Sequence, residues 1–136
     1  IFSLGAKAGA DYALVLLSCG TAASNRADAA FVATSQAECA WTFAPAEFDL
    51  APRRNLLSSK DDNPKKLPLL FNAEWDADNQ SLSNFAMDRG RDDCGDTASY
   101  VWDGAKFRLA QARSMPSCRG TLNWITVWRA KVVFQG

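Results

Sequence analysis

The sequence contains no histidine. This removes the side chain that most often acts as a general base and the most common ligand of zinc. It also excludes serine and cysteine triads of the usual kind, because their base is an imidazole. The sequence therefore predicts no zinc site and no cofactor, and an enzyme built on this chain would have to use carboxyl groups.

Net charge and long apolar runs are missing as well. Fifteen basic and fifteen acidic side chains cancel, so no overall positive field attracts a nucleic acid or an anionic lipid. No run approaches the roughly 18 apolar residues of a membrane-spanning helix. We expect no nucleic acid partner and no membrane span.

The apolar run at residues 12–17 precedes Ser18 and Cys19, as in the lipid-attachment box of a bacterial lipoprotein precursor. Asp11 stands directly before the run, and six residues are too few for such a signal. A short apolar run between polar and glycine-rich segments is instead typical of a buried β-strand.

Further short strands are predicted along the chain, with turn residues between them. Residues 29–35 form a hairpin with residues 12–17 across a long loop, and residues 67–75 form a second hairpin with residues 81–87. Residues 53–68 carry five basic and two acidic side chains and are typical of an exposed loop, with a local basic patch as the alternative. These patterns favour an antiparallel β protein.

Asp103-Gly104 predicts the tightest hairpin, because this dipeptide suits a two-residue type I′ turn. Such a turn would pair Trp102 with Ala105 and Tyr100 with Phe107. Apolar side chains then share one face and charged side chains the other.

The last strand, at residues 122–134, has apolar groups on both faces at its start, which is typical of a central strand. Trp102 and Trp128 are expected in the core, whereas Trp41, Trp75 and Trp124 are undecided.

Four cysteines without a C-x-x-C pair favour disulfides, which form in oxidising compartments such as a periplasm. Extending the hairpin register outward brings Cys94 toward Cys118, so we expect these two to pair. Elimination then pairs Cys19 with Cys39, although sequence alone leaves the two other connectivities open.

Residues 88–96 gather charged side chains in one loop. Such a cluster can hold calcium or raise the pKa of one carboxyl group for glycosidase-like catalysis. The two arginines argue against both uses, because they offer the aspartates internal ion-pair partners. We expect a salt-bridged loop without a metal or a catalytic residue, and we take it as a candidate binding loop consisting of Asp88, Arg89, Arg91, Asp92, Asp93 and Asp96.

Several motifs together resemble one family. The chain contains Asp-Cys-Gly at residues 93–95, Trp-Asp-Gly at 102–104, Met-Pro-x-Cys-x-Gly at 115–120 and Thr-Val-Trp-Arg-Ala at 126–130. These motifs resemble the bacterial secreted family known as domain of unknown function 1176. The resemblance implies export to the periplasm and a framework role for Cys94 and Cys118. It implies no reaction, and it suggests that the chain is the C-terminal portion of a longer precursor.

The sequence thus predicts a single all-β domain over residues 1–136, an antiparallel β-sandwich or half-open barrel with long loops, cross-linked by disulfides. Its predicted function is that of a periplasmic or secreted, non-catalytic binding module that recognises a protein or a cell-wall glycan. One alternative is a carboxylate-based hydrolase acting on a glycan. Another is a structural domain that depends on a missing partner segment, such as the upstream part of its own precursor.

Overall fold

The computed structural model describes residues 1–22, 24–50, 67 and 69–134. The all-β class is confirmed, because the described residues form strands, turns and a single 3-10 turn. The predicted loop at residues 53–68 lies, apart from Leu67, outside the described residues. In chain order the elements are β1 (Phe2–Lys7), β2 (Ala10–Ala22), β3 (Asn25–Ser35), the 3-10 turn Ala37–Cys39, β4 (Trp41–Pro45), β5 (Leu69–Phe71), β6 (Glu74–Asp76), β7 (Ser81–Met87), β8 (Gly95–Trp102), β9 (Phe107–Met115) and β10 (Ile125–Arg129).

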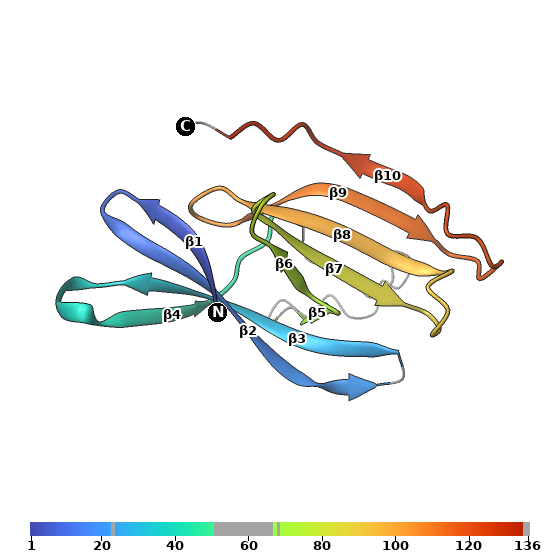
Figure 1. Ribbon diagram of the computed structural model, residues 1–136, viewed down its shortest axis with the longest axis horizontal. Coiled ribbons are helices and arrows are strands. Elements are labelled where there is room, and N and C mark those ends of the chain that lie inside the picture. The colour runs from blue at the N-terminus through green and yellow to red at the C-terminus, as the bar shows by residue number, and fades with distance from the viewer. Residues whose placement is uncertain (23, 51–66, 68, 135–136) are drawn as a thin grey trace.

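The strands form two antiparallel sheets (Figure 1). One has the order β1-β2-β3-β4, and β5 pairs with the part of β3 that β4 leaves free. The other has the order β10-β9-β8-β7-β6. The chain changes sheets between β5 and β6, within the stretch that the sequence predicts as one strand. The result is an open two-sheet arrangement with β10 at an edge.

The core lies where the inner faces of the two sheets meet. Leu14 and Val32 come from the first sheet, and Tyr100 and Phe107 from the second. Phe48, on the segment after β4, stacks on Phe107 at a centroid distance of 5.3 Å and meets Tyr100 edge-on. A fully buried aromatic side chain stabilises the fold by roughly 1.5 to 3 kcal/mol, so these contacts hold the sheets together.

A network of asparagines joins the sheets beside this core. The Asn25 side chain exchanges two hydrogen bonds with the backbone of Met87, at 2.7 and 2.9 Å. Asn72 donates to the Asn25 Oδ1 atom and to the Phe85 carbonyl. Asn84, which takes a buried position on β7, accepts the Phe71 N–H at 2.6 Å. These part-buried polar groups are therefore hydrogen-bonded at the place where the chain passes from the first sheet to the second.

The Asp103 hairpin differs from its prediction in register but not in its faces. Trp102 pairs with Phe107, so four residues form the loop instead of two. The Asp103 Oδ1 atom accepts the N–H groups of Ala105 and Lys106, both at 2.8 Å, which stabilises the wider turn. The shift is an even number of residues, so the face that holds Tyr100 and Phe107 is still the core face.

One of the two predicted disulfides is present. Cys94 and Cys118 are bonded, with their Cα atoms 4.7 Å apart. The predicted Cys19–Cys39 pair is wrong, because both thiols are free and exposed. Cys19 lies beside Asp28 near the start of β3, whereas Cys39 follows the far end of that strand. The seven residue-to-residue steps from Asp28 to Ser35 span roughly 23 Å, beyond the reach of a disulfide.

Three further predictions need correction. The first hairpin has no long loop, since β2 ends at Ala22 and β3 begins at Asn25. The last strand is not central, because β10 lies at the edge of its sheet. Trp128 is 51% exposed instead of buried. Within the described residues, no helix has the length and apolarity needed to cross a membrane.

Candidate functional site

The predicted binding loop connects β7 to β8 and is organised around Asp93. This carboxylate is 2% exposed and accepts two hydrogen bonds from the Arg89 guanidinium, one of them at 2.9 Å. It also accepts the Gly120 N–H at 2.7 Å. The hydrogen bonds from Arg89 outweigh burial and, with that from Gly120, hold the pKa of Asp93 well below its usual range.

Asp93 thus fixes the loop to the segment that follows Cys118. Trp124 adds to this junction, since its indole N–H donates to the Asp92 carbonyl at 3.3 Å and its ring meets Phe85 edge-on. The expected salt-bridged loop is therefore present at its Arg89–Asp93 pair. Its function as a binding loop stays a prediction.

The remaining residues of the loop do not converge on one point. Asp88, Arg91 and Asp92 are exposed, whereas Asp96 is buried on β8. Among the described residues, one group of potential metal ligands lies within reach of a single ion: Asp93, Cys94 and Cys118. Both of its sulfur atoms are consumed in the disulfide, so they offer no thiolate to a metal. This loop has the chemistry of a structural junction.

Three carboxyl groups of the molecule have lowered pKa values. Besides Asp93, hydrogen bonds from Asn79 lower the pKa of Asp76, which closes the β6–β7 turn. Burial raises the pKa of Asp103, but hydrogen bonds from Lys106, Arg108 and Ala105 lower it to about 2. These three groups stay ionised at neutral pH, which does not suit a general acid.

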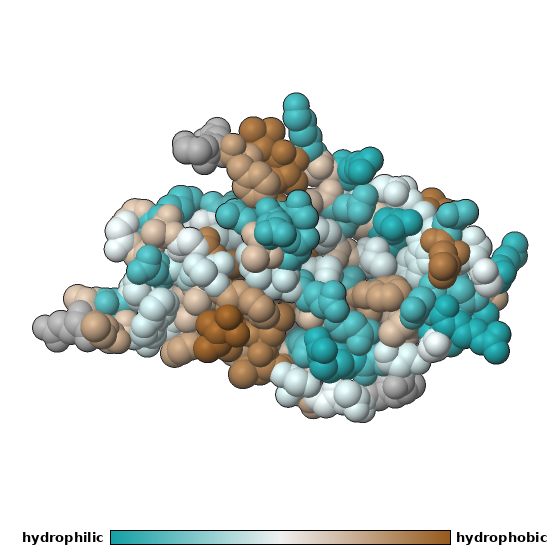
Figure 2. All heavy atoms as spheres, viewed as in Figure 1, coloured by the Kyte–Doolittle hydropathy of each residue, from teal (hydrophilic) through white to brown (hydrophobic). Residues whose placement is uncertain are grey.

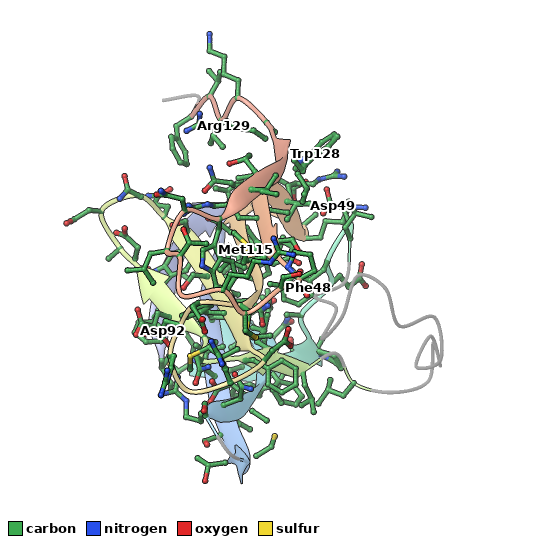
Figure 3. The ribbon with its side chains drawn as sticks, turned by 90° about the vertical axis from the view of Figure 1, so that its right-hand side faces the viewer. Phe48, Asp49, Asp92, Met115, Trp128 and Arg129 are labelled. Carbon is green, nitrogen blue, oxygen red and sulfur yellow. A yellow bond between two sulfur atoms is a disulfide. The ribbon has the colours of Figure 1, made fainter. Side chains whose placement is uncertain are left out.

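The most unusual surface of the molecule lies along β10 and the chain that follows it. Strand β10 pairs with β9 on one side only, and Val127 forms a bulge between Thr126 and Trp128. Every residue of β10 is exposed, including Ile125 at 61% and Val127 at 53%. Figure 3 shows Trp128 and Arg129 pointing to opposite sides of the strand.

The exposed apolar residues continue beyond the strand. In Figure 2 brown atoms gather on the C-terminal tail, which stands away from the rest of the molecule in Figure 1. A brown area also surrounds the N-terminus, where Ile1 is exposed. We define the β10 surface as the exposed apolar residues near and after this edge: Leu122, Ile125, Val127, Trp128, Val132, Val133 and Phe134.

The other tryptophans form no comparable surface. Trp102 lies against Tyr12 and Phe107, and Trp75 packs on the core. Trp41 is exposed on β4 of the other sheet.

The alternation of apolar residues does not reveal the β10 surface, because apolar residues on both faces of a strand are also typical of a central strand. The distribution of charge was the available signal. Residues 104–136 contain six basic side chains and no acidic one, although the whole chain is neutral. The basic residues are Lys106, Arg108, Arg113, Arg119, Arg129 and Lys131.

Comparison with known proteins places this chain in a family without an assigned activity. The chain is 30% identical over 121 residues to the uncharacterized protein YpfG of Escherichia coli strain K12, which covers 87% of this chain. The matched segment is 32% of that relative, so the chain spans about a third of its length. No solved structure matches the chain. The family model for proteins of unknown function DUF1176 matches residues 5–131, and the chain therefore belongs to the DUF1176 family.

Proposed function

We propose that this chain is a protein-binding module of an exported protein and that the β10 surface is its contact surface. The observation that carries the proposal is the exposure of seven large apolar side chains near one unpaired sheet edge. Monomeric proteins rarely leave large contiguous apolar patches in water, and such patches mark interaction sites. The part of this surface that lies on β10, with Ile125, Val127 and Trp128, is held by the pairing of β10 with β9.

The partner is a protein rather than a cell-wall glycan. Five of the seven residues are aliphatic and bind by burial of apolar area: Leu122, Ile125, Val127, Val132 and Val133. Sugars instead stack on flat aromatic faces, and Trp128 and Phe134 are the two aromatic side chains among the seven residues of the β10 surface. Export is supported by the Cys94–Cys118 disulfide, since such bonds persist in oxidising compartments.

The alternative of a carboxylate-based hydrolase has weaker support. It requires two carboxyl groups about 5 to 9 Å apart, one of them with a raised pKa. The shifted carboxyl groups described above have lowered values and bind neighbours in their own loops. The alternative of a partner-dependent structural domain predicts that the β10 surface is covered by another segment of a longer protein.

Capture from periplasmic extract tests the proposal. The double variant Ile125→Ser, Val127→Ser should lose partner protein by about tenfold, because it removes aliphatic area from the interface. Phe43→Ser, which removes an exposed apolar residue from β4 in the other sheet, is the matched control and should capture normally.

Purified peptidoglycan provides the second arm of this experiment. We expect no retention of the wild-type chain on it. Retention on peptidoglycan that survives the double substitution, together with unchanged protein capture, would contradict the proposal and favour a glycan ligand. If the only protein captured is a separately expressed segment of a longer protein that contains this chain, the structural alternative is favoured.

A further inference from the structure

The outer edge of β10 has backbone groups directed away from its own sheet. The Ala130 N–H donates to the Ala110 carbonyl of β9 at 2.8 Å. In an antiparallel pair, successive residues direct their N–H and C=O groups alternately toward and away from the partner strand. The backbone groups of Arg129, which lies between Trp128 and Ala130 on the β9 register, therefore point outward, where a further strand would lie.

The side chains beside these backbone groups are apolar and accessible. Beyond Ala130 the chain leaves β9, and the start of β9 is bonded instead to the segment around Phe48. Val132, Val133 and Phe134 consequently extend without covering a neighbouring strand. A strand added to this edge would bury apolar area on both faces of the sheet.

The charge of the edge selects among possible strands. Arg129 and Lys131 take part in no ion pair within the described part of the chain, whereas Arg108 is paired with Asp103. The carboxylate of Asp49 on the β9 flank is already bonded to the Leu50 and Leu109 N–H groups. The edge therefore presents two basic side chains beside its open backbone groups.

A second copy of the chain is a poor occupant. Two β10 edges would bring four basic side chains together, and residues 104–136 supply no acid to pair with them. Like charges close to one another across paired strands are destabilising, and lysine on an edge strand is a known protection against self-association. Such an edge admits a strand that carries the opposite charge.

We propose that residues 127–134 accept an additional β-strand from an extended polypeptide with alternating acidic and apolar side chains. The acidic side chains pair with Arg129 and Lys131, and the apolar ones cover Trp128 and Val132. Main-chain hydrogen bonds supply affinity and the side chains supply specificity, as in other cases of strand addition. This inference rests on the proposed function and names the chemistry of its partner.

Short synthetic peptides test the inference on the full chain. A peptide of alternating valine and glutamate should bind about tenfold more tightly than its valine and lysine analogue, and added salt should weaken binding. Hydrogen exchange should slow about tenfold at the Arg129 amide on binding. The glutamate peptide N-methylated at every residue keeps its charge but has no N–H group to donate from either edge, so it should not bind.

Two variants locate the binding site. Arg129→Pro removes an outward N–H and leaves the Ala130 bond to β9 intact, so peptide binding should be lost in a folded protein. The double variant Arg129→Glu, Lys131→Glu should reverse the preference toward the lysine peptide. This second variant keeps the test decisive if the proline variant does not fold.

Several results would overturn strand addition. These are equal binding of the N-methylated peptide, unchanged exchange at Arg129, or competition by phosphatidylglycerol vesicles that bind equally well. Failure of every peptide, with protein capture that still depends on Ile125 and Val127, would overturn this inference and leave the proposed function intact. If protein capture did not depend on Ile125 and Val127 either, both this inference and the proposed function would be overturned.

Discussion

Gly95 is held in a backbone conformation that leaves no room for a side chain. Its φ is +136°, and a Cβ atom there would lie 2.0 Å from the Ala86 carbonyl oxygen. Gly95 follows the disulfide-bonded Cys94 and begins β8. The close approach of β7 and β8 at this point therefore depends on glycine.

We expect Gly95→Ala to destabilise the protein by about 2 to 4 kcal/mol, since strain and overlap add. Gly20→Ala is the matched control, because Gly20 has a similar φ of +133° with nothing within 4 Å of the added Cβ. It should cost only about 1 kcal/mol. Urea unfolding measures both values, and equal losses would show that the overlap with Ala86 is relieved.

Asp103 combines a turn and an ion pair in one side chain. Its Oδ1 atom accepts two backbone N–H groups, and its Oδ2 atom accepts the Arg108 Nε–H at 2.6 Å. Its pKa of about 2 in the folded protein is below the value of about 3.9 in an unfolded chain. The stabilisation is therefore complete above about pH 4 and is lost as the pH falls through about 2.

Asp103→Asn should lower the melting temperature at neutral pH, because the charge that Arg108 binds is removed. The difference from the wild type should shrink on acidification and vanish near about pH 2. Thermal unfolding followed by circular dichroism at several pH values measures this. Asp78→Asn, in the exposed β6–β7 turn, is the control and should follow the wild-type curve. If the difference in melting temperature persisted in acid, the effect of the substitution would not depend on the ionisation of Asp103.

At the scale of elements, the periodicity of apolar residues predicted the buried face of a strand better than it predicted how strands pair. The Asp103 hairpin has its predicted core face, because faces depend only on whether a residue is odd or even along the strand. Its register depended on the loop, where the Asp103 side chain stabilises four residues instead of two. Strand β10 is predicted to be central because apolar residues on both faces are typical of a covered strand, but it lies exposed at the edge of its sheet.

The junction between β3 and β7 gives a prediction at this scale. Asn25→Ala would remove the side chain that bonds the Met87 N–H and C=O groups, and the Asn72 amide would keep only its hydrogen bond to Phe85. Part-buried polar groups without partners cost about 1 to 3 kcal/mol, and we expect a loss in that range in urea unfolding. Asn79→Ala, in an exposed turn, should cost less than about 1 kcal/mol. Equal losses would mean that water replaces the Asn25 contacts.

At the scale of the whole molecule, long-range pairings were the least predictable features. Cys94 and Cys118 could be paired from sequence because a hairpin brings them together. Cys19 and Cys39 were paired by elimination, which carries no information on distance. In the candidate loop, the Arg89–Asp93 pair followed from local charge, but the bond from Gly120 to Asp93 joins segments 27 residues apart. Tertiary packing decides such contacts.

The two cysteine pairs allow a direct comparison. Bonded residues 24 positions apart should stabilise the fold by about 3.5 kcal/mol in the chain-entropy model, so Cys94→Ser, Cys118→Ser should lose stability of that order in urea unfolding. Cys19→Ser, Cys39→Ser should change stability by less than about 0.5 kcal/mol, because both thiols are exposed.

Alkylation of the native, unreduced protein provides an independent measurement of the same difference. Mass spectrometry should find adducts at Cys19 and Cys39 only, and adducts at Cys94 and Cys118 should appear after reduction under denaturing conditions. Protection of Cys19 and Cys39 before reduction, together with a loss of stability in their serine variant, would mean that these thiols are also cross-linked. The first sheet would then differ from the arrangement described, since β3 separates the two residues by most of its length.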